Sequence, residues 1–181
     1  MTDFPVPDDE RLNEFRASFS AFSATRELME KGAHGSSETV SARKLYAYAA
    51  GMAAYPNARL EAMLRTHPGM RVAYRRMMNA AATYSLGTAM AASDGDLLPR
   101  SGEGCSIRFE KSQAEKGLYY VIIELQDATQ GAGYLGLCDA ENNCRQFSLP
   151  GARRGIIQFL TDEDSDILNL LRDPNTEVLL R

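Results

Sequence analysis

Hydrophobic and polar positions follow two different periods along the chain, and the change of period divides the sequence into two parts. From Asp8 to Lys31, phenylalanines and other apolar residues recur every three or four positions, which is the spacing of one face of a helix. We therefore predict a long amphipathic helix that ends at Gly32. Prolines and a glycine then separate three shorter helical stretches, at 40–54, 57–65 and 70–82.

The second part of the chain alternates polar and apolar residues with the period of a strand. Cys105, Ile107 and Phe109 alternate with polar neighbours, which predicts a half-buried strand. The turn-rich composition of residues 94–104 indicates a linker. Further strands are predicted at 118–125, 133–138, 144–149, 155–161 and 176–180, with one helix at 164–173. We expect an α+β protein: a helical domain at 1–93, the linker at 94–104, and at 105–181 a small, mainly antiparallel β-sandwich or barrel.

The composition is that of a globular protein. Of 181 residues, 44% are hydrophobic and 24% are charged, which excludes the disordered, collagenous and membrane-spanning classes. The first residues contain no basic segment followed by an apolar one, so we expect no signal peptide, no membrane association and a cytoplasmic location. The chain has three cysteines, too few for a disulfide framework. Cys138 and Cys144 flank a predicted hairpin loop, and we expect them to stay reduced in the cytoplasm.

Charge is distributed unevenly along the sequence. The net charge is −4, yet residues 40–80 contain seven basic side chains and one acidic side chain. A local excess of this kind favours an acidic protein surface or a phosphate backbone as partner. The alternative is that the basic segment faces acidic segments of the same chain.

Three short sequence features resemble sites of chemistry, but the context of each argues against it. Residues 131–136 match G-x-G-x-x-G, but a strand is predicted where phosphate binding needs the start of a helix, so we predict a hairpin turn. Ser41 and Lys44 have S-x-x-K spacing without its partner motifs, so Ser41 is interpreted as a helix N-cap. His34 and His67 have no acid or nucleophile in a recognisable spacing. We predict no catalytic residue, no cofactor and no metal.

The segment 44–78 resembles the anti-sigma domain family of bacterial transcription regulators. The similarity lies in the run Leu45-Tyr46-Ala47-Tyr48-Ala49-Ala50-Gly51, the turn Tyr55-Pro56-Asn57 and the segment 62–71. The zinc ligands of the family fall on Met63, His67 and Met70 in this chain. Thioethers are poor zinc ligands, so the resemblance is to a zinc-less variant in which methionine packing replaces the metal.

This resemblance implies a regulator that covers a sigma factor with its helical domain, while the β domain receives a signal. Arginines would steer the helices toward an acidic partner, and apolar residues would supply contact area. The alternative for the apolar residues is a place in the helical core. The predicted partner-binding residues are Arg43, Leu45, Tyr48, Met52, Arg59, Arg65, Arg71, Arg75 and Arg76.

Two other classes of function remain open, as does homo-oligomer formation. Residues 57–78 have the pattern helix, turn, helix, with Arg71 and Arg75 on one face, as in nucleic-acid-binding proteins. A sequence pI near 5.3 counts against that class. A small-ligand binder or enzyme would instead use polar residues of the β domain. These are Glu124, Asp127, Asp139, Glu141 and Arg145.

Overall fold

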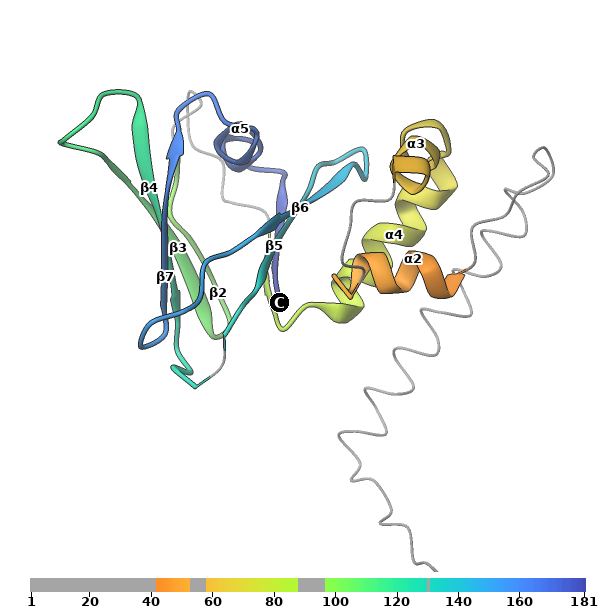
Figure 1. Cartoon of the computed structure of the whole chain (residues 1–181), viewed down its shortest axis with the longest axis horizontal. Helices are drawn as coiled ribbons and strands as arrows, with labels where there is room; N and C mark the ends of the chain where they lie inside the picture. Colours follow the sequence, from red (N-terminus) through yellow and green to blue (C-terminus); the bar gives the residue numbers. More distant parts are fainter. Residues whose placement is uncertain (1–41, 53–57, 88–96, 130) are drawn as a thin grey trace, which may run out of the picture. The chain divides into compact units, whose positions relative to one another are not determined.

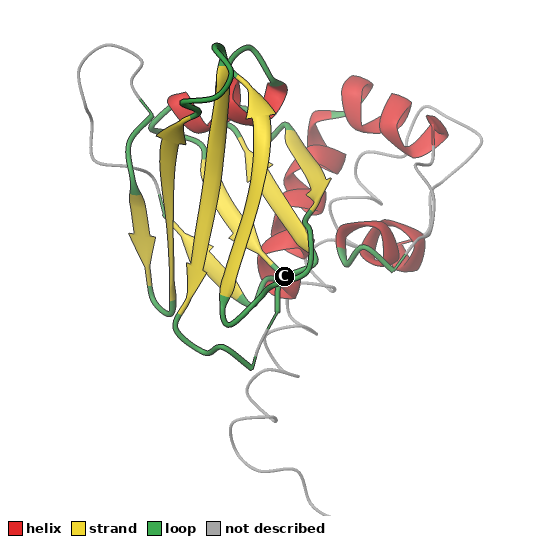
Figure 2. Ribbon diagram, turned by 60° about the vertical axis from the view of Figure 1, so that its left-hand side comes forward, coloured by secondary structure: helices red, strands yellow, loops and turns green. Residues whose placement is uncertain are grey.

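The computed structural model describes residues 42–52, 58–87, 97–129 and 131–181. The helix predicted at 8–31, and Ser41 with its predicted cap, lie outside these residues. The described part contains four helices and eight strands, so the protein is of the α+β type (Figure 1, Figure 2). The chain divides into two compact units, residues 1–80 and 81–181, which we call the helical unit and the sandwich unit.

The helical unit contains three helices in its described part, α2 (Ala42–Ala49), α3 (Ala58–Thr66) and α4 (Pro68–Ala81). Helix α2 is shorter than predicted because the chain leaves the helix at Gly51, whose φ of 55° is in the left-handed region that favours glycine. Helix α4 begins at Pro68, where the missing N–H costs nothing at a first helical position. No helix in the described residues has the length and apolar composition needed to cross a bilayer.

The sandwich unit consists of two four-stranded sheets in which every neighbouring pair of strands is antiparallel. The first sheet has the order β1-β8-β5-β6 and the second has the order β2-β3-β4-β7. The strands of the first sheet are β1 (Tyr84–Leu86), β8 (Glu177–Leu180), β5 (Tyr134–Cys138) and β6 (Cys144–Ser148). Those of the second are β2 (Arg100–Gly102), β3 (Cys105–Lys111), β4 (Leu118–Leu125) and β7 (Ile156–Asp162).

The two sheets share one hydrophobic core. Leu135 and Leu137 of the first sheet belong to the same buried cluster as Ile107 and Ile123 of the second. Helix α5 (Asp166–Arg172), which is capped by the Ser165 side chain, adds Leu168 and Leu171 to this cluster. Two separate sheets around one core make a β-sandwich, so the structure decides between the sandwich and the barrel.

Two strands lie where the sequence analysis placed other elements. Tyr84–Leu86, inside the predicted helical domain, forms β1, and Arg100–Gly102, inside the predicted linker, forms β2. The division between units therefore falls between Ala80 and Ala81 rather than at residues 94–104. A strand of three residues is too short to show a period of two, so these strands gave no signal in the sequence.

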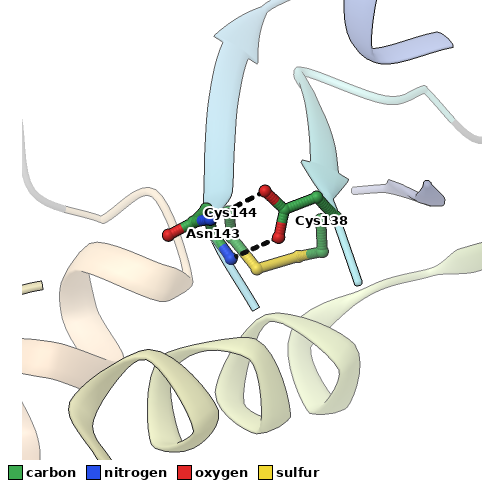
Figure 3. Close-up of a disulfide and its surroundings, with 4 residues drawn as sticks. Cys138, Asn143 and Cys144 are labelled. Carbon is green, nitrogen blue, oxygen red and sulfur yellow. Dashed lines mark hydrogen bonds between the residues drawn. A yellow bond between two sulfur atoms is a disulfide. The ribbon is translucent and has the colours of Figure 1, made fainter. Parts of the chain in front are cut away.

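The hairpin of β5 and β6 is closed by a disulfide between Cys138 and Cys144, with a Cα–Cα distance of 4.1 Å (Figure 3). The expectation that these cysteines stay reduced is wrong for this structure. The hairpin register places the two residues directly opposite each other, and adjacency of this kind is sufficient for a bond once an oxidant is present. Asp139 orders the loop by accepting hydrogen bonds from the backbone N and the Nδ2 of Asn143, at 2.8 and 2.7 Å.

Candidate functional site

One side chain of α2 contacts both α3 and α4. The Tyr48 ring stacks on the Tyr74 ring of α4, with ring centroids 5.5 Å apart. The Tyr48 hydroxyl donates a hydrogen bond of 3.2 Å to Oε1 of Glu61 on α3. Burial, and then the neighbouring carboxylate of Glu61, raise the pKa of Tyr48 to about 12. Tyr48 was predicted to bind a partner, and the structure gives it a role in holding the three helices together.

Arg71 also acts within the helical unit. Its Nη1 donates hydrogen bonds to the backbone oxygens of Leu64, at 3.4 Å, and Arg65, at 3.2 Å. These carbonyls belong to the last turn of α3, where helix geometry leaves them without partners. A positive charge is also favourable at this end of a helix. Arg71, on α4, therefore caps the C-terminal end of α3. The prediction was that Arg71 contacts a partner, whereas the structure shows a contact within the helical unit.

Apolar packing accounts for another predicted contact residue. Leu45 is 0% exposed, so it belongs to the core and is not available to a partner. Other buried residues of the helical unit include Leu60 and three methionines, Met70, Met77 and Met78. The flexible thioether side chain suits a core between short helices. The choice between core and partner contact, which the sequence left open for Leu45, is thus decided in favour of the core.

The three positions on which the expected resemblance to anti-sigma domains places zinc ligands do not suit zinc. Met63 and Met70 present thioethers, whereas zinc sites use thiolate, imidazole and carboxylate. The Nδ1 of His67 lies 2.8 Å from the Thr66 hydroxyl and 3.2 Å from the Met63 carbonyl oxygen. Among the described residues, no group of three or more His, Cys, Asp or Glu side chains is placed to hold a metal ion.

The remaining predicted residues lie at the surface and are mostly cationic. Arg43, Arg59, Arg65 and Arg76 are exposed, Arg75 is half-buried, and Lys44 adds a further exposed charge. In the described part of the helical unit, Glu61 is the sole acidic residue, and it forms an ion pair of 3.7 Å with Arg65. The described helices therefore present an excess of positive charge to solvent.

Met52 is the large apolar residue that the described part of the helical unit exposes to solvent. It follows α2 and is 72% exposed, although its backbone N–H is fixed by a hydrogen bond of 2.9 Å to the Ala47 carbonyl oxygen. An exposed methionine on an ordered backbone can adapt its shape to a partner surface. We define the cationic surface as Arg43, Lys44, Met52, Arg59, Arg65 and Arg76.

The polar residues considered for a ligand site in the sandwich unit mostly have local partners. Glu124 pairs with Arg108 at 3.0 Å, across β3 and β4. Asp139 orders the β5–β6 loop, Arg145 pairs with Asp166 of α5, and Asp127 accepts a hydrogen bond from the Thr129 backbone. Glu141 is exposed in the β5–β6 loop. Each of the first four thus has a local structural partner in the described part of the chain.

The glycine motif at residues 131–136 leads into the strand predicted there, β5, but the hairpin turn predicted for it is wrong, because β4 and β5 belong to different sheets. Tyr134–Cys138 pairs with β6 and β8, so the glycines do not precede a helix N-terminus. The phosphate-binding geometry of a dinucleotide fingerprint needs that N-terminus. The motif is part of the sandwich and not a nucleotide site.

Arg100 is a structural residue that the sequence analysis missed. It is 4% exposed and joins β2 to the end of α5. Its guanidinium donates to the carbonyl oxygens of Thr176, Leu171 and Asp173, the last two at 2.8 Å. Burial lowers the pKa of Arg100, and the carboxylate of Asp173 opposes this effect.

No family model, curated protein or solved structure matches the chain.

Proposed function

We propose that this protein is a non-catalytic regulator whose helical unit docks on an acidic surface of a protein partner. The proposal follows the resemblance to zinc-less anti-sigma domains, in which the partner is a sigma factor and the helices cover surfaces that it needs for polymerase. The observation that carries it is the cationic surface, which lies on three helices joined by the contacts of Tyr48 and Arg71.

The division of labour among the helical residues supports this proposal. Leu45, Tyr48 and Arg71 hold the helices together, so the exposed arginines can meet a partner without loss of the fold. Arginine pairs with carboxylates in a two-pronged geometry, and exposed positive charge accelerates encounter with a negative surface. Met52 supplies an apolar contact within this surface.

The sandwich unit follows helices α2 to α4 in the chain. In this proposal it receives the signal that changes how much of the partner is bound by the helical unit. The partner would be met in the cytoplasm. The Cys138–Cys144 disulfide argues against a cytoplasmic location, because cytosolic thiols are kept reduced. Alkylation of thiols in intact cells tests the location: a reduced pair supports the cytoplasm, and a fully oxidised pair contradicts it.

Nucleic-acid binding is less well supported by the positions of the arginines. Arg71 contacts the carbonyl oxygens of α3, and Arg75 is half-buried. In the helix-turn-helix interpretation these were the two residues that shared the recognition face. A phosphate backbone would then meet fewer of the charges on α4 than the sequence suggests.

Affinity capture with the full chain as bait tests the function. The bait is compared with the double variant Arg43→Glu/Arg76→Glu and with the control Lys111→Glu/Lys116→Glu, which carries the same change of charge on the sandwich unit. We expect a sigma factor to be recovered by the wild type and the control, to be lost from the double variant, and to survive nuclease treatment. Capture that depends on nucleic acid, or that is unchanged in the double variant, would contradict the proposal.

A further inference from the structure

Strand β7 forms one edge of the second sheet, next to β4, and β2 forms the other edge. Ile156 and Leu160 of this strand are each 44% exposed. The strand reads Ile-Ile-Gln-Phe-Leu-Thr-Asp, with no proline or lysine and with a charge only at its last position. Natural sheets protect an exposed edge with proline, lysine or other charged residues, because an unprotected edge pairs with other chains. The edge of β7 therefore has the character of a pairing surface.

The backbone groups available on this edge follow from the turn that precedes it. Arg153 and Ile156 exchange both of their backbone hydrogen bonds, at 2.8 and 3.1 Å. The N–H and C=O of Ile156 thus point away from β4. Because these directions alternate along a strand, those of Gln158 and Leu160 also point to the open side. No hydrogen bond to these two residues on that side is found in the described part of the chain.

The two ends of this edge carry opposite charges. Arg153 and Arg154 lie in the turn at its start, where Arg154 and Gly155 adopt φ values of 54° and 77°. Asp162, Glu163 and Asp164 follow one another at its end. In an antiparallel pair of identical strands, each basic end lies beside the acidic end of the other strand. The edge is therefore complementary in charge to a second copy of itself.

We propose that β7 is a homodimer interface at which two copies join their second sheets through antiparallel pairing. The register follows from Arg153, which already occupies the edge beside Ile156, so the strand of the second copy has to end before that point. A two-fold axis at Leu160 satisfies this condition. Leu160 then pairs with Leu160 of the second copy, and Gln158 lies opposite Asp162 of that copy.

This arrangement covers the backbone groups and the exposed side chains that the edge of β7 presents in a single copy. The two Leu160 residues exchange backbone hydrogen bonds, and their exposed side chains meet on the outer face of the joined sheet. The acidic segment 162–164 of each copy ends beside Arg153 and Arg154 of the other, which fixes both direction and register. The interface belongs to the sandwich unit and is independent of the function proposed for the helices.

Sedimentation velocity of the full chain over a concentration series tests the first part of this proposal. We expect a monomer–dimer equilibrium in the wild type and in the control Gln113→Lys, which adds the same charge at an exposed position of the β3–β4 loop. In Leu160→Lys two positive charges face each other at the axis, so the dimer dissociation constant should rise at least about tenfold. A monomeric wild type, or a dimer that Leu160→Lys leaves unchanged, would overturn the proposal.

A charge exchange tests the register and separates it from any loss of folding. One variant carries Arg153→Glu and Arg154→Asp, and the other carries Asp162→Lys and Asp164→Lys. Each alone places like charges together and should dimerise at least about tenfold more weakly than the wild type. An equal mixture restores opposite charges at both ends and should form the mixed dimer with affinity close to that of the wild type. Failure of the mixture to associate, while both variants keep the wild-type unfolding midpoint, would overturn the register.

Discussion

Tyr48 stacks on Tyr74 with ring centroids 5.5 Å apart, while its hydroxyl donates to Glu61 on a third helix. Two kinds of interaction thus meet at one side chain. The stack joins α2 to α4 through apolar area, and the hydrogen bond joins α2 to α3 through a charged acceptor. The cationic surface depends on this junction, because its residues are distributed over all three helices.

Substitution of Tyr48 separates the two interactions. Tyr48→Phe keeps the stack and removes the hydrogen bond, which should lower the free energy of unfolding by about 1 kcal/mol. Tyr48→Ala removes both and should cost about 2–3 kcal/mol. Chemical denaturation followed by far-UV circular dichroism measures both variants. Equal losses in the two variants would show that the stack contributes nothing.

The raised pKa of Tyr48 predicts a dependence of stability on alkaline pH. The pKa is about 12 in the folded protein, against 10.0 for an ordinary tyrosine. Between these values the unfolded chain has lost the proton that the folded chain keeps, so the free energy of unfolding falls as the pH rises. This contribution is fully present below pH 10 and is lost by about pH 12. Tyr48→Phe should lose less stability than the wild type over that window, and parallel curves would contradict the assignment.

Arg100 should be important for the stability of the sandwich unit. Arg100→Met leaves the carbonyl oxygens of Leu171, Asp173 and Thr176 without their donor, and we expect a loss of about 3 kcal/mol. Arg100→Lys keeps the charge but not the planar fork, so its loss should be smaller but measurable. Thermal unfolding of the full chain gives the comparison. A neutral Arg100→Met substitution would show that water replaces the guanidinium without cost.

The sequence predicted the regular parts of this fold well because they carry strong periodic signals. The strand expected at 118–125 is observed as Leu118–Leu125, the one at 144–149 ends one residue earlier, and the one at 155–161 is shifted by one residue at both ends. Helices α3 and α4 were predicted as stretches separated by prolines and a glycine, with the break between them at Pro68. The strands β1 and β2 were missed because each has only three residues, and the pairing of β1 with β8 also joins segments far apart in the sequence.

The candidate site was predicted less completely, since charge pattern does not distinguish surface from interior. Arg43, Arg59, Arg65 and Arg76 are exposed as expected. Leu45 takes the alternative place in the helical core, and Arg71 instead serves the helical unit itself through backbone oxygens of α3, which its local sequence does not reveal. Arg100 was missed for a related reason, because its three acceptors are backbone oxygens more than seventy positions away.

The Cys138–Cys144 disulfide predicts a defined thiol count and a defined loss of stability on reduction. Burial raises the pKa of the free thiol of Cys105 to about 11, so that group should react slowly in the native protein and be the only one to react after unfolding without reductant. The cysteines are six positions apart, and closure of such a short loop contributes about 2 kcal/mol. Cys138→Ser/Cys144→Ser should lower stability by that amount, and three reactive thiols without reductant would contradict the bond.

The most direct test of the central claim is the affinity of the full chain for a purified sigma factor, measured by titration calorimetry at two salt concentrations. The account predicts saturable binding that weakens with salt. It also predicts that Arg43→Glu/Arg76→Glu reduces affinity at least about tenfold, whereas the sandwich control Lys111→Glu/Lys116→Glu binds as the wild type does. Equal affinity of the wild type and the Arg43→Glu/Arg76→Glu variant, or no binding by either, would contradict it.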